Sequence, residues 1–342
     1  MSEAQDARLP LAPWLQRQLD SLLSQRGHAW LLQGPSGLGQ YPLGLALVEA
    51  WLCDAPSPQG ACGRCASCHA VRVRTHPDLM VLMPETALLA LGWPLSEKAQ
   101  SEIDDKKRKA SREIRVEAMR EAVQFAQRTS SRGRGKAVLV YPAEDMNHIT
   151  ANALLKTLEE PPGDVRFVLA SEAAHRLLPT IRSRCLTHSL VWPGAEEAAF
   201  WLAGQGLPAP AATVLLRAAG GRPEDALMLA ADGLTPESWA QLPRALLRGD
   251  PGVLANWPAA RNIQSLQKIC HDLLATAAGA TPRYFTSQEL PRPPAHKVLL
   301  RWARSLSEAA RTADHPYNPG LMLEALVSEA QIALNSATEP TP

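Results

Sequence analysis

A glycine-rich loop near the N-terminus constrains the fold of this 342-residue chain more than any other feature. The loop runs from Gly34 to Tyr41, follows the apolar run at residues 28–33, and leads into a helical pattern opened by Pro42. In a strand–loop–helix unit of this kind, glycines let backbone N–H groups close around a phosphate at the helix N-terminus. The sequence therefore predicts a phosphate-loop frame built on Gly34, Gly37 and Gly39, although these glycines could serve only a tight turn.

The first half of the chain alternates apolar runs with longer amphipathic stretches. Continuous apolar runs are typical of strands buried on both faces of a parallel sheet, and three more follow, at residues 78–83, 137–141 and 166–170. Residues 112–128 place apolar side chains along one helical face, and a second helix, at 150–160, must end at the prolines that follow it. This alternation predicts a doubly wound α/β domain.

Beyond Trp192 the strand signals fade. Leu- and Ala-rich segments separated by Gly and Pro predict an all-helical C-terminal part. Two segments, residues 96–111 and the tail at 336–342, are charged or polar enough that we expect them to be poorly ordered.

The overall charge and apolar content exclude several classes of protein. Lys and Arg number 35 against 34 Asp and Glu, so the chain has no global basic field of the kind that histone-like binders use. No apolar run approaches the roughly 20 residues that span a bilayer, and the N-terminal residues lack the pattern of an export signal. We therefore expect a cytoplasmic protein without a membrane segment.

The phosphate loop lacks the groups that hydrolysis requires. A hydrolysing loop carries a Lys for the phosphates and a Ser or Thr for magnesium, but Gln40 and Tyr41 occupy these positions. The Asp-Glu pair expected at the end of a following strand falls on Tyr141 and Pro142. Two acidic residues come shortly after, in what we expect to be a solvated loop: Glu144 and Asp145. The sequence therefore predicts no functional nucleotide site and no ATP hydrolysis by this chain.

Four of the six cysteines form a compact C-x8-C-x2-C-x2-C pattern: Cys53, Cys62, Cys65 and Cys68. Thiolates at this spacing can converge on one ion, and four sulfurs leave no open position, so the pattern predicts a structural zinc site. An iron–sulfur cluster of the bacterial ferredoxin type would need a cysteine at position 72, which is Arg72. His69 is expected to be a bystander, and the isolated Cys185 and Cys270 are expected to be buried free thiols.

Three further motifs complete a resemblance. Residues 152–162 read NALLKTLEEPP, 167–170 read FVLA and 181–185 read IRSRC, and together they resemble the AAA+ clamp-loader proteins of bacterial DNA polymerase III. The cysteine insert after the loop helix is shared by that family. Its motor subunits carry a complete lysine loop and an Asp-Glu pair, whereas its non-hydrolysing subunit has degenerate versions of both, as here.

The resemblance implies three domains and one functional arginine. It implies an AAA+ α/β domain with a zinc-binding insert over residues 1–191, a helical lid over 192–234 and a helical collar for oligomerisation over 235–342. Within the motif formed by Ser183, Arg184 and Cys185, it makes Arg184 an arginine finger that reaches the ATP of a neighbouring motor subunit. In the lid, Glu224 stands where a motor subunit places an arginine, which is consistent with an empty site.

These features together predict a stator subunit that hydrolyses nothing itself. The resemblance implies partners: gamma or tau motor subunits and a delta subunit in a hetero-pentameric ring, and, through that ring, the sliding clamp and primer–template DNA. Two alternatives remain, an ATP-hydrolysing motor subunit with drifted motifs and a zinc-dependent nucleic-acid-binding module.

The basic run at residues 106–109 is expected to be a solvated loop, and exposure without DNA contact is expected for Arg132, Arg134 and Lys136.

Overall fold

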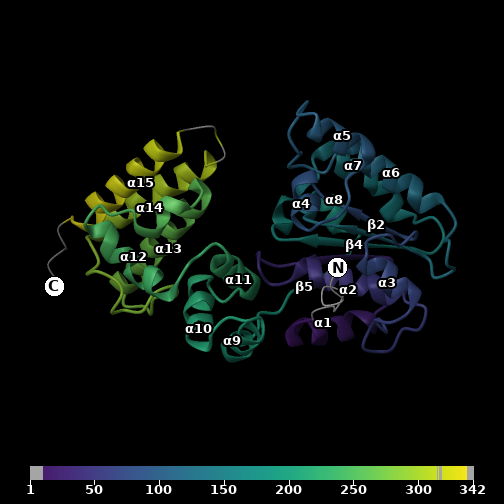
Figure 1. Ribbon diagram of the computed structural model, residues 1–342, viewed down its shortest axis with the longest axis horizontal. Helices are drawn as coiled ribbons and strands as arrows, with labels where there is room; N and C mark the ends of the chain where they lie inside the picture. Colours follow the sequence, from purple (N-terminus) through teal and green to yellow (C-terminus); the bar gives the residue numbers. More distant parts are fainter. Residues whose placement is uncertain (1–10, 314, 316–317, 337–342) are drawn as a thin grey trace. The chain divides into compact units, whose positions relative to one another are not determined.

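Five parallel strands form the sheet of the N-terminal part of the computed structural model, which describes residues 11–313, 315 and 318–336 (Figure 1). The strand order is β2-β3-β4-β1-β5. The strands are β1 (Ala29–Gln33), β2 (Leu79–Leu82), β3 (Lys136–Val140), β4 (Val165–Ser171) and β5 (Leu186–Ser189). Four of them match the predicted apolar runs to within one residue at each end.

The fifth strand was not predicted, and its composition explains why. β5 reads LTHS, with mostly exposed side chains, and it lies at the edge of the sheet beside β1. An edge strand with exposed side chains lacks the apolar signal of a buried one. By contrast, the central strands β3 and β4 are almost fully buried, and their register sets Val138 beside Phe167.

Helices cover both faces of the sheet (Figure 1). α2 packs against β3 and β4, and Gly44 permits its close approach, because a Cβ there would lie 2.9 Å from Leu139 Cδ1. α7 ends at Glu159, before the prolines, as predicted. The helices of this unit are α1 (Pro13–Leu23), α2 (Gln40–Leu52), α3 (Ala66–Arg72), α4 (Glu85–Ala90), α5 (Glu97–Asp104), α6 (Val116–Gln127), η2 (Ala143–Asp145), α7 (His148–Glu159), η3 (Ala174–Arg176) and α8 (Pro179–Arg182).

The chain divides into two compact units, residues 1–192 and 193–342, and the described part of the second unit contains helices but no strand. This confirms the predicted fold class, an α/β domain with a parallel sheet followed by helices. Its helices are α9 (Ala195–Gly204), α10 (Ala209–Ala218), α11 (Pro223–Ala231), α12 (Pro236–Leu247), η4 (Gly252–Asn256), α13 (Ala259–Ala277), α14 (His296–Arg311) and α15 (Pro319–Leu334). In the core of this second unit, Trp239 stacks on Phe285, and the centroids of the two rings are 4.6 Å apart. The lid–collar boundary at 234/235 falls between α11 and α12 and stays a prediction. None of the described helices is long and apolar enough to cross a membrane.

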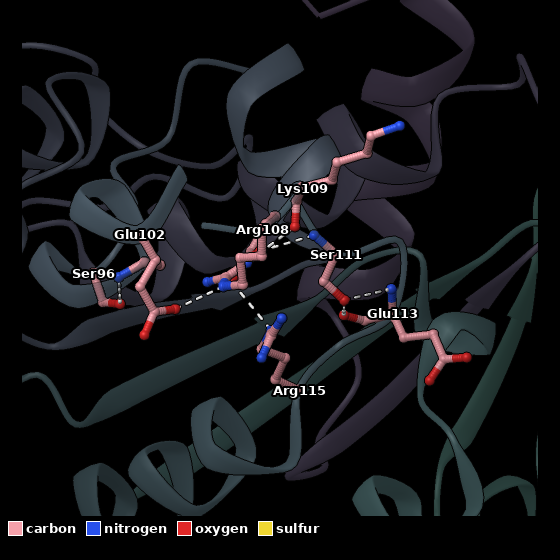
Figure 2. A network of polar contacts seen from close by, with 9 residues as sticks. Ser96, Glu102, Arg108, Lys109, Ser111, Glu113 and Arg115 are labelled. Carbon is pink, nitrogen blue, oxygen red and sulfur yellow. Dashed lines mark hydrogen bonds and ion pairs between the residues drawn. The ribbon is translucent and has the colours of Figure 1, made fainter. Parts of the chain in front are cut away.

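The prediction that residues 96–111 are poorly ordered is wrong. Ser96 caps α5 by accepting the Ala99 N–H, and the segment continues to Arg108, which pairs with Glu102 at 2.7 Å and with Glu85 (Figure 2). The charges that indicated a solvated loop instead pair with one another in specific geometry, so the basic run is not merely solvated. The predicted disorder of the tail concerns residues that, apart from 336, lie outside the described part of the chain.

Candidate functional site

The glycine-rich loop joins the end of β1 to the start of α2, and its role as a phosphate-loop frame stays a prediction. Gly39, the residue before α2, adopts a φ of 98°, which favours glycine. A Cβ at this position would lie 2.5 Å from Leu15 Cδ1 of α1, so the turn excludes a side chain on steric grounds as well. The turn into α2 therefore requires glycine at position 39, and the chemistry of the loop depends on the side chains that follow it.

Gln40 is buried, and its side-chain amide closes the loop from inside. Its Nε2 donates to the carbonyl oxygens of Gly34 and Pro35, at 2.7 and 2.8 Å. Both amide hydrogens therefore have partners in the loop itself, and the group carries no charge. At the position where a hydrolysing loop places a cation on phosphate, this chain has a neutral donor bound to its own backbone.

Two tyrosines stand where the motifs of hydrolysing sites would require magnesium ligands, and the structure brings these tyrosines together. The rings of Tyr41 and Tyr141 are in contact, with centroids 5.4 Å apart. Trp93 Nε1 donates to the Tyr41 hydroxyl at 2.6 Å, and the Tyr141 hydroxyl donates to Glu172 Oε1 at 2.7 Å. Burial raises the pKa of Tyr41, so its phenol stays neutral at physiological pH. Sequence reasoning missed Trp93 and Glu172, because neither belongs to a motif.

Glu144 does not lie in a solvated loop, so that prediction is wrong. The segment forms the short helix η2, Glu144 is buried, and its Oε1 accepts the N–H of Glu172 at 2.9 Å. Burial, followed by the charge of Glu144, raises the pKa of the half-buried Asp145. These two carboxyl groups thus lie in the packed segment that follows the C-terminal end of β3.

The four predicted cysteine ligands converge. Their sulfur atoms all lie within 4.8 Å of one another, and Cys53 Sγ is 3.8 Å from Cys65 Sγ and 3.6 Å from Cys68 Sγ. A tetrahedral zinc ion with bonds of about 2.3 Å would require sulfur separations of about 3.8 Å. Cys53 follows the last residue of α2, and Cys65 caps the N-terminus of α3, so two helix ends position the cluster. The arrangement is compatible with a structural zinc ion.

The surroundings shift the pKa values of these thiols in opposite directions. The backbone N–H of Arg64, with smaller contributions from neighbouring groups, lowers the pKa of Cys62 to about 6, whereas burial raises the pKa of Cys53 and of Cys68. A bound dication stabilises the thiolate form and offsets the cost of burial. Next to the cluster, Asp54 accepts a hydrogen bond from the Ser67 hydroxyl at 2.7 Å and so ties the start of the loop to α3.

Arg184 lies on the turn that follows α8, and its guanidinium is held within the chain. Nε donates to Glu159 Oε1 at 2.6 Å, a second nitrogen also contacts that oxygen, and Nη1 donates to the Thr180 carbonyl at 2.8 Å. The Arg184 side chain is 30% exposed and that of Glu159 is 46% exposed. Ser183 Oγ also donates to the Thr180 carbonyl, and burial raises the pKa of Cys185 to about 12. The arginine is thus a surface group in an ion pair.

Lys136 is not exposed, so the prediction for this residue is wrong. It is the first residue of β3, and its Nζ lies 3.1 Å from Asp78 Oδ1 and 4.0 Å from the centre of the Phe125 ring. Asp78 is fully buried and also accepts the N–H of Ser131, and because a buried carboxylate is costly without a cation, its charge accounts for the inward position of Lys136. Exposure was expected for two further residues and is confirmed: Arg132 and Arg134. In the second unit, Glu224 lies in the first turn of α11, where a carboxylate suits the helix dipole.

Comparisons with known proteins identify the family. A family model described as "DNA polymerase III, delta subunit" matches residues 13–192. The DNA polymerase III subunit delta' of Yersinia pestis is 31% identical over 321 residues, which cover 86% of this chain and 87% of that protein. The chain belongs to the delta-prime family of DNA polymerase III subunits. The predicted resemblance to clamp-loader proteins is thereby confirmed.

Other members of the family are more similar over a shorter length. The delta' subunit of Pseudomonas aeruginosa is 40% identical over 230 residues, covering 65% of this chain and 62% of that protein. That of Escherichia coli K12 is 34% identical over 223 residues, covering 64% and 60% respectively. The matched regions thus span about three fifths of these two relatives. Subunits named gamma and tau of the same polymerase match only 163 residues of this chain.

Proposed function

We propose that this chain is a clamp-loader subunit that does not hydrolyse ATP. The observation that carries the proposal is the contact between Tyr41 and Tyr141, two aromatic residues at the positions where the motifs of hydrolysing subunits require magnesium ligands. Gln40 supports it, since a neutral amide bound to loop carbonyls cannot offset phosphate charge. Hydrolysis requires both the cation and the magnesium ligands, so the loss of both leaves a scaffold.

Arg184 acts in trans on the ATP held by a neighbouring motor subunit. A guanidinium spreads its charge over several donors and can stabilise the charge that develops on a transferring phosphoryl group. Its present partner does not prevent this role. The pair with Glu159 lies at the surface with both side chains partly exposed, and pairs of that kind contribute about 0–1 kcal/mol, so a phosphate can replace the carboxylate at little cost.

The subunit works in a hetero-pentameric ring with gamma or tau motor subunits and a delta subunit. Through that ring it contributes to loading the sliding clamp on primer–template DNA in the bacterial cytoplasm. Residues 192–234 serve as the lid and residues 235–342 as the collar that joins the subunits. The relationship to delta', gamma and tau subunits supports these assignments.

The cysteine cluster holds one structural zinc ion. Its ligands are Cys53, Cys62, Cys65 and Cys68, and closed four-sulfur coordination leaves no position for a substrate. When bound, the ion supplies folding energy to a loop that has few apolar residues. The residues of the chain contribute by orienting the thiolates from the ends of α2 and α3.

The decisive experiment measures ATP turnover by the reconstituted clamp-loader ring. We expect R184A to leave assembly intact and to lower DNA-stimulated turnover, since arginine fingers contribute about 10³–10⁵ in rate at the site they serve. R184K, which keeps the charge but loses the planar fork, should not restore the rate. The matched control is R176A, at an exposed arginine nearby on η3. Unchanged turnover by R184A would exclude the finger.

A second experiment addresses the chain by itself. Isothermal titration of the purified chain with Mg-ATP should detect no magnesium-dependent binding, and a coupled assay should detect no turnover. Vigorous hydrolysis by the isolated chain would contradict the proposal and favour a motor subunit.

A further inference from the structure

A groove of about 550 Å³ lies beside β2, on a part of the N-terminal unit that the proposed function does not use. Partly exposed apolar side chains form its floor, among them Met80, Leu95 and Ala118. One wall comes from the segment around α5, and the other from the segment leading into α6 and from α6 itself. The groove therefore combines an apolar floor with charged walls, and it lies between an edge strand and two helices.

β2 presents its edge to this groove. Four consecutive residues, Met80 to Met83, line it, and since alternate side chains of a strand point to opposite faces, such a run follows the edge rather than one face. In the described sheet β2 pairs with β3 alone, and three of its four residues are only half-buried. An edge of this kind is a template on which an extended peptide can add a strand.

The α6 side of the groove carries exposed negative charge. Glu117 and Glu121 lie four residues apart on α6 and line it, together with Glu113 just before the helix, which accepts a hydrogen bond from Asn147 Nδ2 at 3.2 Å; all three glutamates are exposed. Carboxylates at this spacing repel one another, and a cation placed between them relieves the repulsion. On the opposite side, Lys98 is an exposed cation. The α6 side is thus complementary to basic side chains.

The wall opposite α6 is held in place by Arg108 (Figure 2). This guanidinium contacts Glu102 of α5 and the nearly buried Glu85 of α4, while Arg115 approaches Glu85 at 3.3 Å. Ser111 N–H donates to Glu85 at 2.8 Å. The carboxylates on this side are therefore neutralised internally, which leaves the charge of the α6 row available to a ligand.

We propose that this groove binds an extended peptide segment of a protein partner in which apolar residues alternate with Lys or Arg. The peptide adds a strand to the free edge of β2. Its apolar side chains pack on Met80, Leu95 and Ala118, and its basic side chains face Glu117 and Glu121. Peptide binding at this groove does not depend on the arginine finger or on the zinc site. An experiment that refutes one of these proposals therefore leaves the others standing.

The test uses a phage library of random short peptides, selected on the full chain and depleted on the double variant E117K/E121K. The enriched peptide is then synthesised with a fluorophore, and its Kd is measured by anisotropy. We expect alternating apolar and basic residues, and a Kd that the double charge reversal weakens roughly tenfold or more. The matched control E308K/E324K changes net charge equally at two exposed glutamates of α14 and α15 and should leave the Kd unchanged.

Further variants separate the parts of the proposal. A118R should abolish binding by placing a guanidinium on the apolar floor, and E117Q/E121Q should weaken it by an intermediate factor. Peptides with proline at alternate positions should bind poorly, because proline cannot donate to a strand ladder. Thermal unfolding establishes that each variant is folded. The proposal is wrong if no peptide is enriched, if the enriched peptides are acidic, or if they bind the groove variants as tightly as the original chain.

Discussion

Replacing Cys68 by serine tests the cysteine cluster most directly. Cys68 is fully buried, and its sulfur lies 3.4 Å from that of Cys65 and 3.6 Å from that of Cys53, near the edge length of a zinc–sulfur tetrahedron. Structural zinc contributes on the order of 10–16 kcal/mol in small modules. If four thiolates share this equally, losing one costs about 2.5–4 kcal/mol, or about a hundredfold to a thousandfold in the zinc Kd.

Two measurements check this estimate. Elemental analysis of the purified chain should find one zinc per molecule, and a competing chelator should remove it far more readily from C68S. Limited trypsin digestion reports the loop itself, because Arg64 is exposed and lies between two of the ligands. Cleavage there should accelerate in C68S and on chelation, since loss of a ligand that binds only the folded loop lowers its local stability.

The control for C68S is C270S, which removes an equally buried thiol from α13, outside the cluster. C270S should keep its zinc and its protection from trypsin. The reasoning would be refuted by a wild-type chain that holds no zinc or holds iron, or by C68S and C270S losing zinc at the same chelator concentration.

Three further predictions concern other polar groups. E159Q should change the free energy of unfolding by no more than about 1 kcal/mol in chemical denaturation, because its pair with Arg184 lies partly exposed at the surface; a larger loss would make that pair structural. R108A should speed hydrogen exchange in residues 97–104 but not in β3, and unchanged exchange would show that the ion pairs do not hold α5. Burial lowers the pKa of His76, so the unfolded chain binds its proton more readily and stability should fall as pH drops below about 6.5; H76Q should reduce this dependence, and an equal dependence in both proteins would exclude His76 as its source.

The parts of this molecule that follow local rules were predictable from the sequence. Continuous apolar runs predicted the buried strands, and the prolines after Glu160 predicted the end of α7. The cysteine spacing predicted that four sulfur atoms converge, as they do in the structure. β5 and the segment containing Arg108 were missed for a common reason. An exposed edge strand and an ordered network of opposite charges are specified by partners distant in the sequence, such as β1 and Glu85, and not by their own composition.

The candidate site shows the same division. Gln40 and Tyr41 were recognised as departures from a motif, but their hydrogen bonds and ring contacts depend on tertiary structure. The buried position of the Lys136 side chain likewise depends on Asp78, which lies just before β2. Sequence patterns therefore located the groups of interest, while their protonation and accessibility required coordinates.

The paired tyrosines also bear on how this subunit type can change over time. Tyr41 is braced by Trp93, and Tyr141 by Glu172, so four residues from separate segments support one another. Restoring lysine at position 40 would leave this aromatic plug in place. Recovery of ATP hydrolysis would require several coordinated substitutions, none of which is beneficial alone. The loss of hydrolysis is therefore difficult to reverse by single mutations.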